Sequence, residues 1–323
     1  MSVQITRFSQ PISDAGDALK AAKMDWNVSL EPVLNPRTGK ETAIHWLFRD
    51  DTNEVLGEFR KGYTPLQNRE HVEYLANFAY DNDFQFIGMG SRRGQFFAQI
   101  KIGEHMVGGV SPTKNIITGL FSHDGTLATS YHPTNTVIVC QNTFMANVAQ
   151  AQIEGMKFKK TKSILERMET GIALIELAKI ENSNLMGIFD MLTKIRMSPT
   201  QLKEFVLDRL YPVQVDAKNK KAENIQNKII EIVEFNDNGQ IPEVAGTAWA
   251  AFNGITNYFN HVIGTGKADK MTESDRLDAA MDREFNLISG DAAKRQQTAF
   301  QMITEFAETQ NPQSFAAFSF PKA

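Results

Sequence analysis

The adjacent residues Ser122, His123 and Asp124 are the residue types of a hydrolytic triad, and they lie in the segment FSHDGTLATSYHPTNTVIVCQNTF, residues 121–144. A Ser-His-Asp relay is assembled from separate elements of a fold, so neighbours in one turn cannot form it. Asp-Gly is also among the favoured dipeptides of β-hairpin turns. We therefore predict that His123 and Asp124 are turn residues between two strands.

Cys140, the single cysteine of the chain, is the next candidate nucleophile. It ends the apolar run TVIVC, where a lone cysteine usually packs as a small hydrophobic side chain. A catalytic cysteine also needs a histidine beside it in space. An enzyme that uses Cys140, or a metal held by carboxylates, is the least supported hypothesis, and we predict no catalytic residues and no enzymatic activity.

Metal and nucleotide chemistry have no specific motif in this sequence. The six histidines are scattered, with neither HExxH nor paired cysteines. The run GMGSRRG, residues 88–94, has a glycine spacing one residue too long for G-x-G-x-x-G, and it precedes a strand where that motif requires a helix. We predict no metal site and no cofactor.

Basic residues interleaved with aromatic ones are the strongest remaining candidates for a site. They occur in RKGY, SRRG and MKFKKTK, and such sets hold phosphates while aromatic rings stack on bases. A solvated surface that happens to be basic is the alternative reading, and it remains open. The predicted DNA-binding residues are Lys61, Tyr63, Arg92, Arg93, Lys157, Phe158, Lys159, Lys160 and Lys162.

Composition and charge bound the class of protein. The chain has 323 residues, 42% of them hydrophobic and 22% charged, which favours one large or two modest globular domains. The net charge of -4 argues against a uniformly basic nucleic-acid binder, although binding depends on where the charges lie. A single cysteine, no signal peptide and no long apolar run lead us to expect a cytoplasmic protein with no membrane partner.

The elements that must position these residues differ between the two halves. Residues 43–50 and 55–66 read as a hairpin, and residues 68–83 as a helix with Asn68 as its N-cap. Further strands follow to about residue 140, and a helix starts near Asn142. We predict an α+β fold: an N-terminal antiparallel β-sheet with a packed helix, in β-β-α-β-β-β-β-α order, followed by a mostly α-helical C-terminal half.

The second half has the periodicity of amphipathic helices, and we predict helices at residues 222–235, 274–288 and 291–310 among others. Ser198, Pro199 and Gln201 form a helix start with a capping box, and Pro242 is expected to open a long helix that closes near Gly264. The predicted domains are a β-rich α+β core at residues 1–155 and a helical domain at 156–310. The aromatic tail at 311–323 has no helical period and is predicted to be mobile.

Several blocks, in order, resemble the phage/plasmid-like family of domain of unknown function nine-three-two. They are KGYTPLQNREHVEYL, GSRRGQFFAQIKI, the SHDGT…VCQNT segment and GTAWAAFNGITNYFNHV, and the resemblance runs from about Tyr63 to Phe300. In the last block Asn253, Thr256, Tyr258 and His261 match the family pattern, whereas Gly254 and Asn257 depart from it. The element order is also similar to single-strand annealing proteins of the Rad-fifty-two and Redβ type, which implies a sheet-lined basic groove and assembly into rings or filaments.

The leading hypothesis, which the resemblance implies, is a phage or plasmid DNA-recombination protein that acts in the cytoplasm of a bacterial host. It would bind single-stranded DNA as a homo-oligomer, as a ring or a filament, and promote annealing of complementary strands without ATP. The alternative is a self-assembling structural or host-interaction protein of a mobile element, with no DNA-binding activity.

Overall fold

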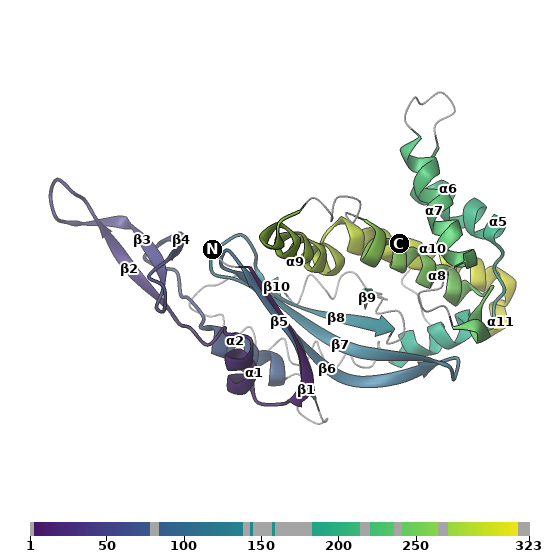
Figure 1. Ribbon diagram of the computed structural model, residues 1–323, viewed down its shortest axis with the longest axis horizontal. Coiled ribbons are helices and arrows are strands. Elements are labelled where there is room, and N and C mark those ends of the chain that lie inside the picture. Colours follow the sequence, from purple (N-terminus) through teal and green to yellow (C-terminus); the bar gives the residue numbers. More distant parts are fainter. Residues whose placement is uncertain are drawn as a thin grey trace.

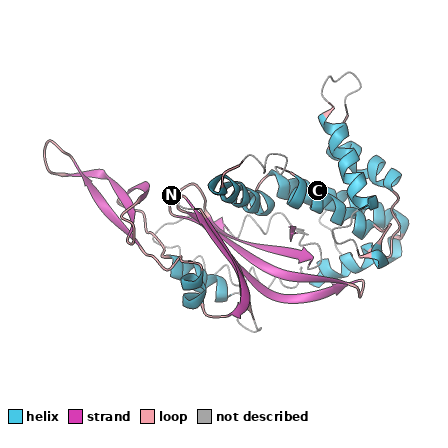
Figure 2. Ribbon diagram, viewed as in Figure 1, coloured by secondary structure: helices cyan, strands magenta, loops and turns pink. Residues whose placement is uncertain are grey.

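The computed structural model describes residues 3–77, 84–137, 143–144, 157–158, 183–213, 220–235, 241–263 and 271–315 (Figure 1). Strands dominate the first half and helices the second, as Figure 2 shows, so the predicted α+β class is confirmed. The strands form two separate antiparallel sheets rather than one.

The main sheet has seven strands in the order β1-β5-β6-β7-β8-β10, with β9 paired to β8. Its two longest strands, β6 and β7, pair without interruption except for a bulge near Lys101. The bounds are β1 Gln4–Ile12, β5 Gln85–Arg92, β6 Gln95–Val107, β7 Ser111–Ser122, β8 Thr129–Val137, β9 Thr143–Phe144 and β10 Lys157–Phe158. The helix predicted to start near Asn142 does not begin at Thr143, because Thr143 and Phe144 pair with β8 as a strand.

Turn chemistry explains the hairpins of this sheet. Arg93 and Gly94 join β5 to β6 with φ values of 48° and 79°, the left-handed conformation that a tight two-residue hairpin turn requires. Residues 123–128 join β7 to β8, and Gly125 has a φ of 78°. Both predicted hairpins are confirmed.

A second sheet forms an arm that projects away from the body of the molecule (Figure 1). Its strands are β2 Val28–Leu34, β3 Glu41–Arg49 and β4 Val55–Arg60, paired in that order. The predicted hairpin at residues 43–66 is confirmed, but it lies in this arm and not in the main sheet. A small core of Trp26, Val28, Leu47 and Leu56 supports one face of the arm.

Helices α1 Ala15–Ala21 and α2 Asn68–Asn77 cover one face of the main sheet. Their apolar residues pack on Phe86, Phe96, Ile117 and Phe121, which are at most 4% exposed. Asn68 is not the N-cap of α2, because its side-chain amide donates to the carbonyl oxygens of Met24 and Trp26. Residues 78–83 of the predicted helix lie outside the described residues.

Helix α9, Glu273–Ser289, lies over the opposite face of the sheet (Figure 1). Met281 and Ile288 of α9 pack against Phe97 and Leu120 of the sheet in a small apolar cluster. Strand β6 is therefore buried on both faces, and Phe96 to Ile100 form one continuous buried run.

The helical lobe has its own large core around Phe189, Trp249, Phe252 and Phe300. The capping box of Ser198 and Gln201, with Pro199 in the first turn, is confirmed. Helical residues 183–192 precede the other elements of this lobe. These are α5 Pro199–Leu202, η1 Lys203–Leu207, α6 Asp208–Leu210, α7 Lys221–Phe235, η2 Pro242–Val244, α8 Ala248–Asn257, η3 Tyr258–Val262, α10 Asp291–Gln310 and α11 Pro312–Phe315.

Two predictions for the helical half are wrong in detail. Pro242 opens only the short turn η2, and α8 starts at Ala248 with Thr247 as its N-cap, because Gly246 breaks the helix with a φ of 68°. The tail predicted to be mobile from residue 311 begins with α11, whose Phe315 is 1% exposed and belongs to the helical core. Residues 316–323 lie outside the described residues.

The tip of the β6–β7 hairpin joins the sheet to the helical lobe. Val107 is fully buried in the helical core, and the Gly108 N–H donates to Asp190 at 2.7 Å. The same carboxylate lies 3.0 Å from Nε2 of His105. The sheet also continues past the predicted domain boundary at residue 155, since β10 pairs with β8.

Candidate nucleic-acid interface

One end of the main sheet gathers most of the predicted site residues. Strands β5 and β7 end there and β6 and β8 begin there, because Arg92 pairs with Gln95 and Gln95 pairs with Ser122. The exposed Arg93 lies in the β5–β6 turn at this end. His123 follows Ser122 directly, and its N–H donates to the Gly94 carbonyl oxygen at 2.6 Å, which ties the two turns together. We call this region the turn end of the sheet.

The base of the arm packs on the turn end. A Cβ atom added to Gly57 of β4 would lie 3.2 Å from Cα of Asp124, and one added to Gly125 would lie 3.1 Å from the Phe59 ring. These close approaches place the segment after β4, with the exposed Lys61, at the same end of the molecule as Arg93. The fold thus brings together two cations that lie far apart in the sequence.

Tyr63 does not offer a free ring for stacking. Its ring stacks on Phe59 at a centroid distance of 3.8 Å and an interplanar angle of 14°, within the arm core. Burial, and the nearby Asp124 carboxylate, raise the pKa of Tyr63 well above its usual value. In this conformation Tyr63 packs within the base of the arm, and a base cannot stack on the ring face that Phe59 covers.

Arg92 is paired with carboxylates of α9. Its Nη1 lies 2.6 Å from Asp282 and 3.7 Å from Asp278, and it also donates to the Asp278 carbonyl oxygen at 3.3 Å. The Arg92 side chain is only 17% exposed. The charge of Arg92 is therefore compensated within the chain, whereas neighbouring Arg93 is exposed.

Strand β10 brings the start of the lysine run to the turn end. Lys157 pairs with Ser130 and Phe158 with Thr129, the first residues of β8. The side chains of Lys157 and Phe158, and Lys159, Lys160 and Lys162 as a whole, lie outside the described part of the chain, as does Cys140.

A chain of polar side chains crosses the sheet on the face that α9 covers. Arg7 of β1 donates to the Gln99 Oε1 at 2.5 Å, Gln99 donates to Thr118 at 3.3 Å, and Thr118 lies 3.1 Å from Thr134. Arg7 also forms an ion pair with Glu284 of α9. Gln99, Thr118 and Thr134 are at most 4% exposed, so this is a buried polar network on a sheet face.

Gly88 makes this network possible. Arg7 pairs with Gly88 across β1 and β5, and Gly88 pairs with Gln99 across β5 and β6. A Cβ atom at Gly88 would lie 2.5 Å from the Arg7 Nη1, so only glycine leaves room for the guanidinium to cross β5. Sequence reasoning missed Arg7, and the GMG run was its only sequence signal.

The SHDG segment has no relay geometry, as predicted. Asp124 accepts hydrogen bonds from the hydroxyls of Ser122 and Thr126, both at 2.6 Å, and so closes its own turn. His123 instead lies 2.7 Å from Asn68 through Nε2. His123 lies in the turn between β7 and β8, as predicted, but its ring is fully buried against Trp26 and Phe96.

The remaining chemistry of the described residues is limited. Within them, no group of three or more histidine, cysteine or acidic side chains could hold a metal ion. No helix among them is long and apolar enough to span a membrane.

Residues 55–309 match the model of the domain of unknown function family DUF932. The chain belongs to this family. The match covers strand β4 of the arm, helix α2, the main sheet from β5 onwards and nearly all of the helical lobe. No curated protein and no solved structure matches the chain.

Proposed function

We propose that this DUF932 protein binds single-stranded DNA at the turn end of its main sheet and promotes annealing of complementary strands without ATP. The observation that carries the proposal is the convergence at this end of Arg93, Lys61 and the start of the lysine run at Lys157. These residues come from three separate parts of the sequence.

The proposed mechanism is electrostatic. The cations hold the phosphates of a strand along the turn end, and the bases stay exposed for pairing with a second strand. Because phosphate contacts release counterions, affinity falls steeply as salt rises. Because α9 compensates the charge of Arg92, Arg93 and Lys61 are the two predicted cations that the structure describes as exposed at this surface.

The test is annealing of two complementary oligonucleotides that carry an energy-transfer pair, at low salt and without nucleotide. We expect acceleration by the wild type, and a loss in the double variant Lys61→Gln/Arg93→Asn; asparagine tolerates the positive φ of position 93. The salt slope of binding should flatten by about one unit for each lost contact. The control is Lys228→Gln/Lys294→Gln, which removes two charges from helices α7 and α10 of the helical lobe.

No acceleration by the wild type, together with no mobility shift of either strand, would contradict the proposal. Equal annealing by both double variants would instead contradict the assignment of the surface.

We further propose a phage or plasmid origin and an architecture related to Rad-fifty-two and Redβ-type annealing proteins. An antiparallel sheet with helices packed on one face supports this by analogy of fold alone. Electron microscopy of the protein with and without single-stranded DNA tests it, since that architecture requires rings or filaments.

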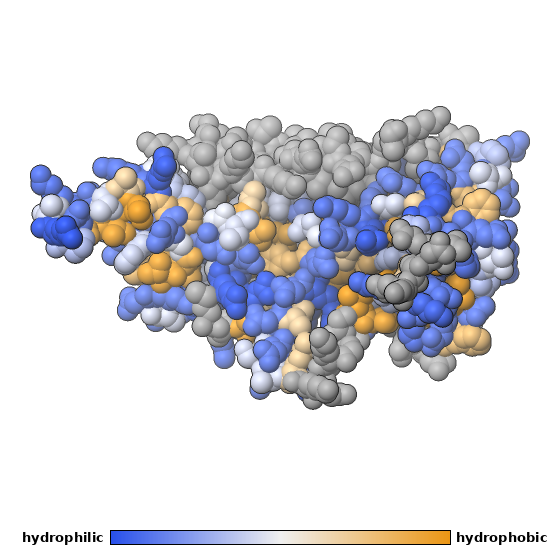
Figure 3. Space-filling model, turned by 90° about the horizontal axis from the view of Figure 1, so that it is seen from above, coloured by the Kyte–Doolittle hydropathy of each residue, from blue (hydrophilic) through white to orange (hydrophobic). Residues whose placement is uncertain are grey.

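The arm favours the second candidate function, self-assembly without DNA. Leu34, Ile44, Trp46 and Val55 are 37–55% exposed on its strands. Figure 3 shows apolar surface on the arm, at the left of the view. Strands β2 and β4 are the two edges of its sheet, and exposed edges with apolar side chains pair readily with another chain. If Trp46→Ser dissociates an oligomer while strand binding is absent in every variant, this candidate replaces the first.

A further inference from the structure

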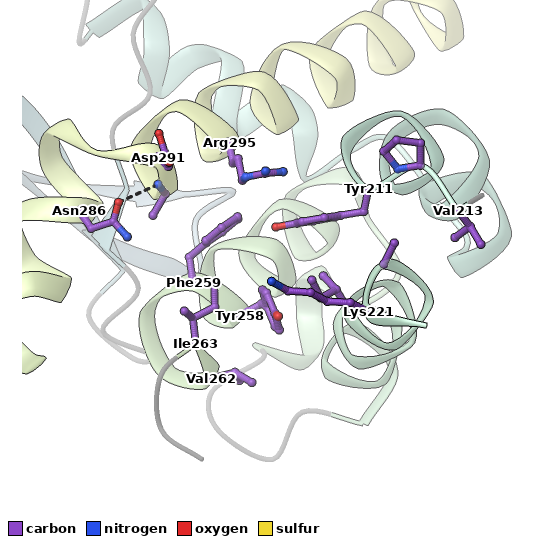
Figure 4. Close-up of a pocket in the computed structure, with 14 residues that line it drawn as sticks. Tyr211, Val213, Lys221, Tyr258, Phe259, Val262, Ile263, Asn286, Asp291 and Arg295 are labelled. Atoms are coloured by element: carbon purple, nitrogen blue, oxygen red, sulfur yellow. Dashed lines mark hydrogen bonds between the residues drawn. The ribbon is translucent and has the colours of Figure 1, made fainter. Parts of the chain in front are cut away.

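A cleft of about 690 Å³ opens in the helical lobe beside the end of α9 (Figure 4). Its walls come from the segment after α6, the start of α7, the short helix η3, the start of α10 and Asn286 of α9. This volume is within the range of small-molecule sites, roughly 300–1,000 Å³. None of the predicted DNA-binding residues lines it.

The cleft combines two cations with aromatic walls. Arg295 and Lys221 are the cationic lining residues, and Tyr211, Tyr258 and Phe259 supply rings. Figure 4 shows Tyr211, Lys221 and Arg295 extending toward one another from different elements. Aromatic faces take a flat ligand, and clustered cations take an anion.

Arg295 is held in position but keeps donors for a ligand. Its guanidinium lies over the Tyr211 ring at 5.0 Å and donates to the Leu210 carbonyl oxygen at 3.2 Å. Among the described residues no carboxylate forms an ion pair with it. A guanidinium has five N–H donors, so a bidentate contact to a phosphate remains available.

Asp291, the acidic residue among the described lining residues, forms no ion pair with Arg295. The Asp291 side chain is 87% exposed and lies 3.6 Å from Lys294, on the outside of the first turn of α10. Helices α7 and α10 both begin at the cleft, at Lys221 and Asp291, and helix starts carry partial positive charge. The electrostatics of the cleft therefore favour an anion.

The Tyr211 hydroxyl adds a neutral hydrogen-bond donor to the cleft. In Figure 4 it points toward the side of the cleft where Arg295 lies, so it can donate to an oxygen of a ligand held there. Burial raises the pKa of Tyr211 to about 12, against the opposing effect of nearby Arg295.

We propose that this cleft binds a nucleoside phosphate, with the base against the tyrosine and phenylalanine rings and the phosphate on Arg295 and Lys221. The ligand is either a free mononucleotide or the phosphorylated end of a DNA strand. This function goes beyond strand binding at the turn end, and it stands or falls independently of it.

The test is calorimetric titration of the full chain with thymidine 5′-monophosphate, thymidine, inorganic phosphate and an oligonucleotide with or without a 5′-phosphate. We expect the monophosphate, the phosphorylated strand end, or both, to bind better than thymidine and phosphate. Lys221→Gln and Arg295→Gln should each weaken that binding about tenfold, since a charge-assisted hydrogen bond is lost. Lys228→Gln, on the same helix α7 but not lining the cleft, is the matched control and should bind like the wild type.

The two sources separate by the probe. If the free monophosphate binds, and the two strands bind with equal affinity whether or not they carry a 5′-phosphate, the cleft is a mononucleotide site. If the phosphorylated strand binds more tightly than the unphosphorylated strand, the cleft is a strand-end site. No binding of any phosphorylated probe, or equal loss in Lys228→Gln, would overturn the proposal. Phosphate alone binding as tightly as the monophosphate would overturn the role of the aromatic walls. Because Arg295→Gln removes packing on Tyr211, the thermal unfolding midpoint of this variant is measured as well. If Arg295→Gln is unfolded, the affinity of Lys221→Gln for the monophosphate decides the test.

Discussion

The two faces of the main sheet are covered in different ways. Helices α1 and α2 close one face with apolar contacts, such as those among Phe86, Phe96, Phe121 and Leu75. Helix α9 covers the other face with a smaller apolar cluster and with carboxylates, which pair with Arg7 and Arg92.

The contacts on the two faces of the sheet should respond differently to salt. Burial of apolar surface is insensitive to moderate salt, whereas ion pairs that are partly exposed weaken as salt screens them. Asp282 is 67% exposed and Arg7 49% exposed, so the charged contacts of α9 are open to screening. The contacts of α1 and α2 with the sheet are thus expected to be insensitive to salt, whereas the ion pairs between α9 and the sheet are expected to weaken as salt rises.

The largest effect should come from the apolar face. Phe121 is fully buried, with ring centroids at 4.4 Å from His71 and 4.7 Å from Phe96. Phe121→Ala should lower the free energy of unfolding by about 3–5 kcal/mol, because it removes a buried ring and leaves a cavity. Chemical denaturation measures this.

The control for Phe121→Ala is Ile44→Ala on the arm, where the side chain is 45% exposed. Its free energy of unfolding should stay within about 0.5 kcal/mol of the wild type. Similar losses in both variants would mean that the α1–α2 face is no more tightly packed than the arm.

An intermediate effect is expected from the polar network of the α9 face. Gly88→Ala would place a Cβ atom 2.5 Å from Arg7 Nη1 and separate Arg7 from Gln99. We expect a loss of about 1–3 kcal/mol in the free energy of unfolding, since a buried polar group loses its partner.

The matched control is Gly103→Ala, a glycine of β6 whose added Cβ would meet only Asn115, at 3.7 Å. That substitution should be close to neutral. Equal thermal unfolding midpoints for Gly88→Ala and Gly103→Ala would show that Arg7 contributes no stability through this network.

Local sequence signals predicted much of this fold. The Asp-Gly turn, the Ser198 capping box and the 3.6-residue periods of α7, α9 and α10 depend on neighbouring residues alone, and all are confirmed. Strand β1 was not predicted: its residues QITRFSQPI have no regular alternation and become a strand only by pairing with β5.

The candidate site was predicted only in part, because its contacts join distant segments. Asn68 has the type of an N-cap, yet its amide binds backbone groups more than 40 residues away, a tertiary contact that overrides the local preference. Arg92 and Arg93 look alike in sequence, and only the placement of α9 distinguishes the paired arginine from the exposed one. Arg7 needed Gly88, which is 81 positions further along the chain.

Removal of the α9 carboxylates should have the smallest effect on stability, and it tests most directly whether the two faces of the main sheet differ in role. In the double variant Asp282→Asn/Glu284→Gln, Arg92 and Arg7 lose partners in partly exposed ion pairs. Such pairs contribute about 0–1 kcal/mol each, so the free energy of unfolding should change little. If the proposed strand binding is correct, affinity for single-stranded DNA at low salt should rise severalfold, because Arg92 at the turn end and Arg7 on the same face of the sheet each lose a neutralising carboxylate.

The charge-matched control is Glu231→Gln/Glu305→Gln, which removes two carboxylates from the helical lobe. It raises the net charge equally, so a purely global effect would increase strand affinity by the same factor in both double variants. The α9 variant should exceed the control at low salt and converge with the wild type at high salt, where screening removes the difference. A fall in stability as large as that of Gly88→Ala, with no gain in affinity, would instead make the α9 ion pairs structural, and the two faces of the sheet would then differ in chemistry but not in role.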